Sequence, residues 1–361
     1  MNSADVAIAG AGIIGLTSAL ELKDAGCNVT VFDQGEAMSE ASRAAAGMLA
    51  GADPENPTEL RELAKLSLAC YPGFLARVED LSAKRIPIRT TTTVQGVKHL
   101  PATLDHATIL RTVLSEREVN ARAPGANTAG WKFLLLEEQS IDAWDLAEAL
   151  PAAARAAGIE LRENTSVFTV RGGTSGVDIV TADGTFSAGS FLNATGAWAP
   201  SLDRSLPVAP RKGHMLTTEL PGELQMHCVL RTASVYIIPR GATRYTIGST
   251  LEDAGFDRNV DPRLIHDLFS RAVDLWPPLR DANIAETWVG FRPGSEDGLP
   301  IIDQTSERCW VATGHFRNGI LLGPGTGRVL SQWIVGREPE IDLSPFRCGR
   351  FALSPALSPA S

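Results

Sequence analysis

The feature that most constrains the fold of this chain is a glycine motif close to its start. An apolar run enters Gly10, Gly12 and Gly15, which are spaced G-x-G-x-x-G. A helical pattern follows, and a second apolar run, 28–32, ends at Asp33. A strand, tight turn, helix, strand and terminal acid in this order are typical of a dinucleotide-binding βαβ unit. The alternative is an ordinary βαβ unit with a glycine-rich turn.

Each part of the motif has a physical role. Gly10 permits the tight turn, Gly12 lets the backbone approach a pyrophosphate, and Gly15 lets the helix pack closely on the strand. The helix N-terminus presents unpaired N–H groups and the positive end of the helix dipole to the phosphates. Asp33 is placed to accept hydrogen bonds from ribose hydroxyls.

Composition limits the class of protein. At 361 residues the chain is long enough for two domains, and 44% hydrophobic with 21% charged residues describes an ordinary globular protein. The net charge of −9 argues against a nucleic-acid partner. No apolar run of about twenty residues occurs, so we expect no membrane span.

The cysteines indicate a reducing compartment. They are odd in number, scattered, and without metal or redox spacing, which favours the cytoplasm and predicts no metal site: Cys27, Cys70, Cys228, Cys309 and Cys348. The first strand begins almost at Met1, so we expect no signal peptide.

The pattern of apolar residues predicts two interleaved domains. Short, β-branched runs replace the helical and strand pattern from about residue 86, and β-rich sequence returns after residue 213. We therefore expect an α/β nucleotide-binding domain made of 1–85, 140–213 and 291–350. A second, mixed-sheet domain comprises 86–139 and 214–290, and 351–361 forms a flexible tail.

Three helix features follow from local sequence. A helix is predicted from near Thr58 to Leu81, and Pro72 should kink it or divide it. Asp142 is expected to cap a second helix, and Asp261 with the following proline to cap and begin a third.

Several motifs occur in an order that resembles the D-amino-acid oxidase family of FAD-dependent amine oxidases, and its glycine oxidase branch in particular. They occupy 10–15, 42–49, 193–198, 236–240, 290–300 and 314–322, and the resemblance extends from residue 3 to about 345. It implies a Rossmann-like FAD-binding domain of the glutathione-reductase type and a second α+β substrate domain.

The resemblance implies a set of cofactor contacts. Besides the glycine motif, small residues at 42–48 let the backbone approach a flat ligand, although they also fit a plain helix start. The expected FAD-binding residues are Gly10, Gly12, Ile13, Ile14, Gly15, Asp33, Gln34, Ser42, Arg43, Ala45, Ala46, Gly47, Met48, Val167, Ala194, Thr195, Gly196, Trp198, Arg292, His315, Arg317, Asn318, Gly319 and Ile320. Cys309 is not in the context of the family's flavin-linking cysteine, so we expect non-covalent FAD.

The resemblance also assigns substrate-binding residues. Arg292 matches the arginine that binds the substrate carboxylate, for which a guanidinium fork is suited. The alternative is an ion pair with Glu296 or Asp297. Tyr236 matches a tyrosine that hydrogen-bonds the same carboxylate, or it is a sheet residue with a solvated hydroxyl.

Other polar residues are open to two interpretations. Arg317 either faces the active site or lies at the surface, and His315 is structural or a flavin-side contact rather than an acid or base. His214 is expected to face solvent, and Leu251 to form an apolar wall. Ser234 stands where some relatives carry a larger polar residue, which affects substrate preference.

The implied activity is oxidative deamination of glycine, sarcosine or small D-amino acids. A hydride passes to flavin N5, giving an imine or 2-oxo acid, ammonia or an amine, and hydrogen peroxide after reaction with oxygen. The family context implies thiamine biosynthesis and a homo-oligomer, a dimer or tetramer. The alternatives are a D-amino-acid or N-methyl-amino-acid dehydrogenase with another electron acceptor, and a non-catalytic flavin-binding module.

Overall fold

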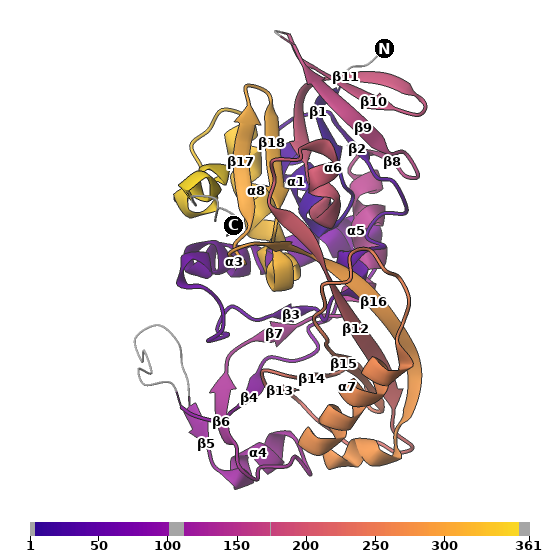
Figure 1. Cartoon of the computed structure of the whole chain (residues 1–361), viewed down its shortest axis with the longest axis vertical. Helices are drawn as coiled ribbons and strands as arrows, with labels where there is room; N and C mark the ends of the chain where they lie inside the picture. Colours follow the sequence, from indigo (N-terminus) through magenta and orange to yellow (C-terminus); the bar gives the residue numbers. More distant parts are fainter. Residues whose placement is uncertain (1–3, 101–111, 174, 354–361) are drawn as a thin grey trace, which may run out of the picture.

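Two large sheets dominate the computed structural model, which describes residues 4–100, 112–173 and 175–353. In Figure 1 one sheet lies above the other, and the two longest strands run between the upper and lower halves. These strands are β12 (Val208–Glu219) and β16 (Asn283–Ser295).

The upper sheet has the order expected of a nucleotide-binding domain. Its path is β17-β18-β11-β1-β2-β8, with parallel pairing from β18 through β8, and β10 and β9 extend it as an antiparallel pair. β2 lies on one side of β1 and β11 on the other, so the strand order changes direction at β1. Such a topological switch point is where open α/β sheets bind ligands. The predicted fold class is confirmed. The strands are β1 (Ala4–Ala9), β2 (Val29–Phe32), β8 (Glu160–Arg162), β9 (Val167–Gly172), β10 (Val177–Thr181), β11 (Gly184–Asn193), β17 (Ile301–Ser306) and β18 (Cys309–Thr313).

Helices pack together in this upper half. They are α1 (Ile13–Asp24), α3 (Arg61–Ser82), α5 (Ala143–Ala156) and α8 (Gly319–Ile334), with the short α2 (Ala41–Ala44) and α6 (Ala199–Leu202) nearby. Asp142 caps α5 by accepting a hydrogen bond from the Trp144 N–H at 3.0 Å, as predicted.

Two side chains of α3 complete the hydrogen bonding of α8. Pro324 has no N–H, so the carbonyl of Ile320 lacks its helical donor. The Tyr71 hydroxyl donates to that carbonyl instead. Ser67 donates to the Leu321 carbonyl at 2.6 Å and accepts from the Gly325 N–H at 2.9 Å. These bonds hold the start of α8 in a fixed position.

Pro72 does not divide α3, so that part of the prediction is wrong. The helix runs unbroken from Arg61 to Ser82. Buried side chains lie on both sides of the proline, including Leu63, Ser67 and Val78. Their packing against α8 and α5 outweighs the cost of one missing hydrogen bond.

The lower sheet is mixed, as predicted. Its order is β16-β12-β15-β14-β13-β4-β6-β5, with β13 and β4 parallel and the other neighbours antiparallel. Its remaining strands are β4 (Thr93–Val97), β5 (Thr112–Leu114), β6 (Lys132–Leu136), β13 (Val229–Arg231), β14 (Tyr236–Pro239) and β15 (Arg244–Gly248). A small separate sheet pairs β3 (Met48–Leu49) with β7 (Gln139–Ser140).

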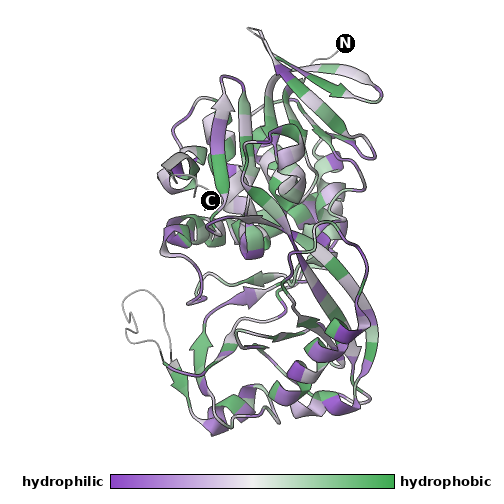
Figure 2. Ribbon diagram, in the orientation of Figure 1, coloured by the Kyte–Doolittle hydropathy of each residue, from purple (hydrophilic) through white to green (hydrophobic). Residues whose placement is uncertain are grey.

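Two helices accompany the lower sheet: α4 (Glu116–Arg122) and α7 (Pro262–Leu275). Asp261 caps α7 through the Arg263 N–H at 2.8 Å, which confirms the predicted start. Figure 2 shows that the outward side of α7 is largely hydrophilic, and its buried side contributes Ile265, Leu268 and Ala272 to the lower core. None of the described helices is long and apolar enough to cross a membrane.

The predicted domain boundaries fall inside the longest strands. β12 and β16 pair from Val208 opposite Ser295 to Glu219 opposite Asn283, which crosses the expected limits at 213/214 and 290/291. Of the predicted tail, residues up to 353 belong to a 3-10 turn, Cys348–Leu353, and the rest lies outside the described residues.

Candidate active site

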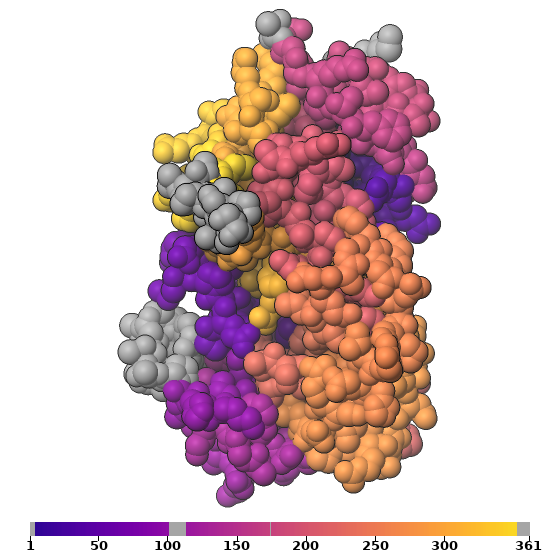
Figure 3. Space-filling model, viewed as in Figure 1, coloured from indigo at the N-terminus to yellow at the C-terminus, as the bar shows by residue number. Residues whose placement is uncertain are grey.

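A cavity of about 340 Å³ lies where the two sheets meet. Its walls come from the ends of β1, β2 and β11, the starts of α1 and α8, and strands of the lower sheet. In the space-filling view, early and late segments of the chain meet along the middle of the molecule (Figure 3). The site is therefore assembled from segments far apart in the sequence.

The glycine motif forms one end of the cavity. Gly10 has φ +102°, and a Cβ there would overlap the Ala194 carbonyl, so no other residue fits without strain. Gly12 is the N-cap of α1 and makes no side-chain cap hydrogen bond. Ser42 Oγ accepts from the Ile13 N–H at 2.9 Å. The start of α1 thus lines the cavity with its positive end, which suits a pyrophosphate.

Asp33 follows β2 at the same end of the cavity. Its Oδ2 accepts from the Ala11 N–H at 2.7 Å, and its Oδ1 accepts from the Gly35 N–H at 2.9 Å. Burial raises the pKa of the Asp33 carboxyl, and these two backbone bonds oppose the rise. The bonds fix the carboxylate on the cavity wall.

Most of the predicted contact residues line this one cavity, and three do not. A Cβ at Gly15 would overlap the Gly10 carbonyl, as expected for close helix–strand packing. Gly47 has φ +74° and abuts the Ile141 carbonyl, and Arg43 is exposed over the Trp144 ring at 5.0 Å. The predicted residues that line it are Gly10, Gly12, Ile13, Ile14, Asp33, Gln34, Ser42, Ala45, Ala46, Met48, Val167, Ala194, Thr195, Gly196, Trp198, Tyr236, Arg292, His315, Arg317, Asn318, Gly319 and Ile320.

Arg292 projects from β16 into the opposite end of the cavity. Its Nη2 donates to Ser249 Oγ at 2.7 Å, and its Nη1 donates to the Thr250 carbonyl at 3.3 Å. A Cβ at Gly213 would overlap the guanidinium, so the side chain lies against bare backbone. Burial lowers the pKa of Arg292, yet arginine stays charged at neutral pH.

Among the described residues, Arg292 has no carboxylate partner. The ion pairs with Glu296 or Asp297, considered from the sequence, do not form, and Asp297 instead pairs with Arg350 at 2.7 Å. Only neutral oxygens hold the guanidinium. A charged group in a desolvated site without a counter-ion is costly, so the site favours an anion from outside.

Tyr236 reaches the cavity from β14, which pairs with β15. Its hydroxyl lies 3.5 Å from Met215 Sδ, a weak acceptor. A Cβ at Gly248 would overlap the tyrosine ring. Gly213 and Gly248 were not singled out from the sequence. Both lie inside strands, where a glycine marks a close approach, Gly213 in β12 and Gly248 in β15.

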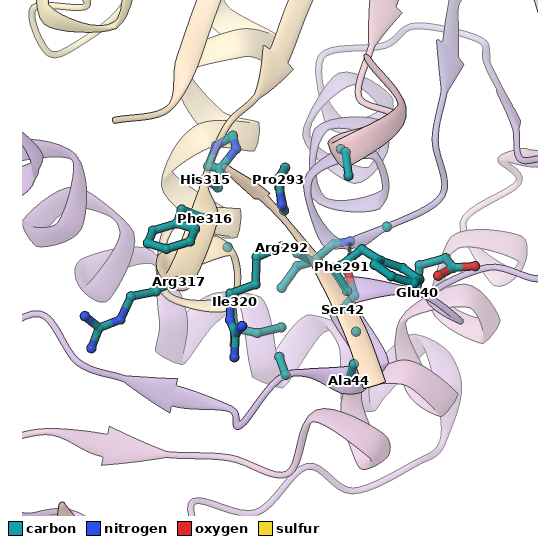
Figure 4. A pocket seen from close by; sticks show the side chains of 18 of the residues that line it. Glu40, Ser42, Ala44, Phe291, Arg292, Pro293, His315, Phe316, Arg317 and Ile320 are labelled. Atoms are coloured by element: carbon teal, nitrogen blue, oxygen red, sulfur yellow. Dashed lines mark hydrogen bonds between the residues drawn. The ribbon is translucent and has the colours of Figure 1, made fainter. Parts of the chain in front are cut away.

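Arg317 follows β18 and is half-exposed. Its Nη1 lies 2.9 Å from Glu55 Oε2, and its Nη2 lies 3.7 Å from Asp53 Oδ2. Figure 4 shows its side chain extending away from Ser42 and Phe291. The residue lines the cavity and is also partly at the surface, so both interpretations of the sequence hold in part.

His315 is a buried, neutral residue of the cavity wall. Its Nε2 lies 3.1 Å from Thr326 Oγ1, and its Nδ1 has no hydrogen-bond partner in the described part of the chain. Burial lowers the pKa of its imidazole to about 3, so the ring carries no charge at neutral pH. The unpartnered nitrogen and the uncapped start of α8 next to it are free to bind polar atoms of a ligand.

The structure corrects the expectation for His214 and qualifies that for Leu251. His214 does not face solvent, because Thr250, Glu252 and the Asp261 N–H surround its ring and its exposure is 0%. Leu251 lines the cavity but is 61% exposed, so it forms part of the rim.

A buried ionic cluster on the cavity wall was missed from the sequence. Arg231 on β13 lies 3.0 Å from Glu138 and 3.5 Å from Asp53, and it donates to Gln95 Oε1 at 2.8 Å. Its members come from segments far apart in the chain, and no local motif joins them. No cluster of three or more potential metal ligands occurs within the described ranges.

The residues present therefore fit a long ligand with an anionic centre. The start of α1 and Asp33 line one part of the cavity, and the turn into α8 and Arg292 line another, where Arg292 has no carboxylate partner among the described residues. The comparison with protein families agrees, because the family described as FAD dependent oxidoreductase matches residues 5–333. The chain belongs to this family.

Its similar relatives include enzymes with known structures. It is 36% identical to glycine oxidase of Geobacillus kaustophilus over 96% of this chain and 97% of that protein. It is 32% identical to glycine oxidase of Pseudomonas aeruginosa over 94% and 97%. The crystal structure of the Geobacillus kaustophilus enzyme superposes with a TM-score of 0.90, covering 97% of this chain and 99% of that one.

These matches confirm the family, the FAD cofactor and the enzyme class that the sequence resemblance implied. Figure 4 brings together three of the cavity segments: residues 40–44, the strand that carries Phe291 and Arg292, and the turn with His315 to Ile320.

Proposed function

We propose that this enzyme oxidises glycine and related small amines, such as sarcosine and small D-amino acids, with oxygen as the electron acceptor. Glycine, oxygen and water would give glyoxylate, ammonia and hydrogen peroxide. The observation that carries the proposal is the charge of Arg292, which neutral oxygens orient and no described carboxylate neutralises.

Arg292 binds the substrate carboxylate in this proposal, and Tyr236 donates a hydrogen bond to it. Both residues line the cavity, and strand pairing holds them on neighbouring parts of one sheet. A guanidinium fork matches a carboxylate in shape and charge. Such a clamp fixes the α-carbon of a small amino acid in one place.

The cofactor occupies the rest of the cavity in this proposal, from the glycine motif to the turn beside the strand of Arg292. The start of α1 receives the pyrophosphate, Asp33 the ribose, and the turn from His315 into α8 the polar edge of the flavin ring. When bound, FAD supplies the acceptor for a hydride equivalent. We propose that it binds non-covalently and that Arg317, held by Glu55, lies at the entrance to its site.

We further propose a homo-oligomer located in the cytoplasm and acting in thiamine biosynthesis. The five cysteines are all free, which supports a reducing compartment. The upper sheet would serve the cofactor and the lower sheet the substrate.

The test is the visible spectrum of the FAD-loaded protein without oxygen, recorded as glycine, sarcosine, D-alanine and D-proline are added in turn. Glycine or sarcosine should bleach the flavin band, and admitting air should restore it with release of peroxide. Methylamine is the matched control, since it is glycine without the carboxylate, and it should leave the band unchanged.

Other outcomes would count against specific parts of the proposal. Equal bleaching by methylamine would contradict the carboxylate clamp. Bleaching that air does not reverse would favour a dehydrogenase with another acceptor. A flavin band that none of the four amines bleaches would overturn the substrate class and leave the family unchanged.

A further inference from the structure

Two buried residues and a partly exposed glutamate behind Arg292 hold the two oxygens that orient its guanidinium. Arg292 donates to Ser249 Oγ and to the Thr250 carbonyl, and its position depends on where these two residues lie. Behind them, His214, Thr250 and Glu252 bind one another, and we call these three residues the Thr250 bracket.

The Thr250 hydroxyl is the centre of the bracket. Its Oγ1 accepts from the His214 N–H at 2.8 Å and donates to Glu252 Oε1 at 2.6 Å. The Thr250 N–H also lies 3.4 Å from the His214 carbonyl. Thr250 is 8% exposed and His214 is fully buried, so the bonds between these two residues form away from bulk water. They fix the peptide whose carbonyl contacts Arg292.

The His214 ring connects the bracket to the start of α7. Its Nε2 accepts from the Asp261 N–H at 2.9 Å, so the neutral ring carries its proton on Nδ1. Nδ1 lies 2.8 Å from Glu252 Oε1. His214 therefore donates to the same carboxylate oxygen that the Thr250 hydroxyl binds. Each polar atom of the ring has a partner.

The bracket orients Arg292 without neutralising it. Glu252 binds His214 and Thr250 and makes no hydrogen bond to the guanidinium. The Ser249 hydroxyl and the Thr250 carbonyl accept hydrogen bonds from the guanidinium and, being neutral, leave its net charge for a ligand. A direct carboxylate partner would instead compete with that ligand.

We propose that His214, Thr250 and Glu252 are positioning residues that preorganise Arg292 for a carboxylate ligand. The inference rests on the proposed function in one respect only, that Arg292 receives a carboxylate. The bracket then sets affinity for that carboxylate rather than the rate of the chemical step.

The test compares Thr250→Val, which keeps the shape and loses the hydroxyl, with Thr250→Ser, which keeps the hydroxyl. KM and kcat for glycine are measured, together with binding of glycolate to the resting FAD-loaded enzyme from the change in its flavin spectrum. Thr250→Val should raise KM and the glycolate Kd by about tenfold and change kcat by less than about twofold. Thr250→Ser should stay within about twofold of the wild type.

Two further sets of variants keep the result interpretable. Thr287→Val, at an exposed site on the strand that carries Arg292, should change neither constant. Glu252→Ala should raise KM and the glycolate Kd as Thr250→Val does. Glu252→Gln should keep the wild-type values, since the amide oxygen still accepts both hydrogen bonds. If Thr250→Val does not fold, the comparison of Glu252→Ala with Glu252→Gln tests the proposal.

The inference requires that the bracket act through Arg292. In an Arg292→Ala background, adding Thr250→Val should weaken glycolate binding no further. Wild-type affinity in Thr250→Val, or an equal further loss in the Arg292→Ala background, would overturn it. Glycolate binding does not need glycine oxidation, so a protein that binds glycolate through the bracket but never oxidises glycine would contradict the proposed function alone.

Discussion

Two arginines line the same cavity in opposite electrostatic settings. Arg231 lies in a buried cluster with Glu138, Asp53 and Gln95, where its charge is balanced. Arg292 is held by neutral groups, among them the Ser249 hydroxyl and the Thr250 carbonyl. A balanced buried charge contributes to the folded structure, whereas an unbalanced one favours an incoming anion. Charge balance, more than burial, separates a structural arginine from a candidate binding residue here.

The largest expected effect comes from removing the unbalanced charge. Arg292→Ala should lower kcat/KM for glycine by about 10³-fold, since the substrate carboxylate loses a charged partner in a desolvated site. FAD should stay bound and the unfolding midpoint in urea should not fall. Arg85→Ala, at a surface arginine that is 87% exposed, is the matched control and should behave as wild type. An unchanged kcat/KM in Arg292→Ala would contradict a binding role for Arg292 and leave it no different from Arg231 in function.

Replacing Arg231, whose charge is balanced, should lower stability more than activity. Arg231→Met should lower the free energy of unfolding by about 3 kcal/mol, because Glu138 then stays buried without its partner. Arg231→Met combined with Glu138→Leu should recover most of that loss, since Glu138 is no longer a lone buried charge and Asp53 keeps its contact with Arg317 at 3.7 Å. Urea unfolding of the three proteins measures this. A single variant as stable as wild type would show that the cluster carries no structural role.

A third basic group of the cavity, His315, extends the comparison to pH. Its folded pKa of about 3 lies below the ordinary value of 6.5, so the unfolded chain binds more protons between these values. Its contribution to stability is complete above about pH 6.5 and is lost as pH falls towards 3.

Between pH 7.5 and 5.0 the unfolding free energy of His315→Gln should therefore fall by about 2 kcal/mol less than that of the wild type. Urea unfolding at the two pH values, at saturating FAD, gives the difference. Parallel losses in the two proteins would mean that burial does not hold this imidazole neutral.

The smallest effect is expected at Arg317, which is half-exposed and already paired with Glu55. Exposed ion pairs contribute little, so Arg317→Ala should change kcat/KM for glycine by no more than about threefold. Steady-state kinetics at two salt concentrations would measure it. A loss approaching that of Arg292→Ala would place Arg317 in the binding site and show that pairing with an acid does not exclude such a role.

Local sequence predicted the elements that depend on neighbouring residues. The turn at Gly10, the caps at Asp142 and Asp261, and the strand that ends at Asp33 all form as expected. Pro72 is the exception, since α3 continues through it. The prediction at Pro72 considered the one hydrogen bond that a proline removes from a helix, and a local sequence pattern does not show the packing of that helix against α8.

The end of the cavity that contains Arg292 and Tyr236 was less predictable. Arg292 and Tyr236 were found through their motifs, but their surroundings were not. His214 was expected at the surface and is buried, because the Asp261 N–H at the start of α7 donates to its Nε2. Gly213 and Gly248 reveal their roles only when the strands are paired and the side chains of Arg292 and Tyr236 lie over them.

The sequence by itself determined the glycine-motif end of the cavity, because a turn of this type uses backbone conformation and a helix start within one short segment. The tertiary structure alone decided which buried charges are balanced. Glu138 and Asp53 reach Arg231 from distant segments, and the pairing of β12 with β15 and β16 leaves Arg292 facing only neutral oxygens. Charge balance depends on distances between side chains, and those distances are set when the two sheets pack together.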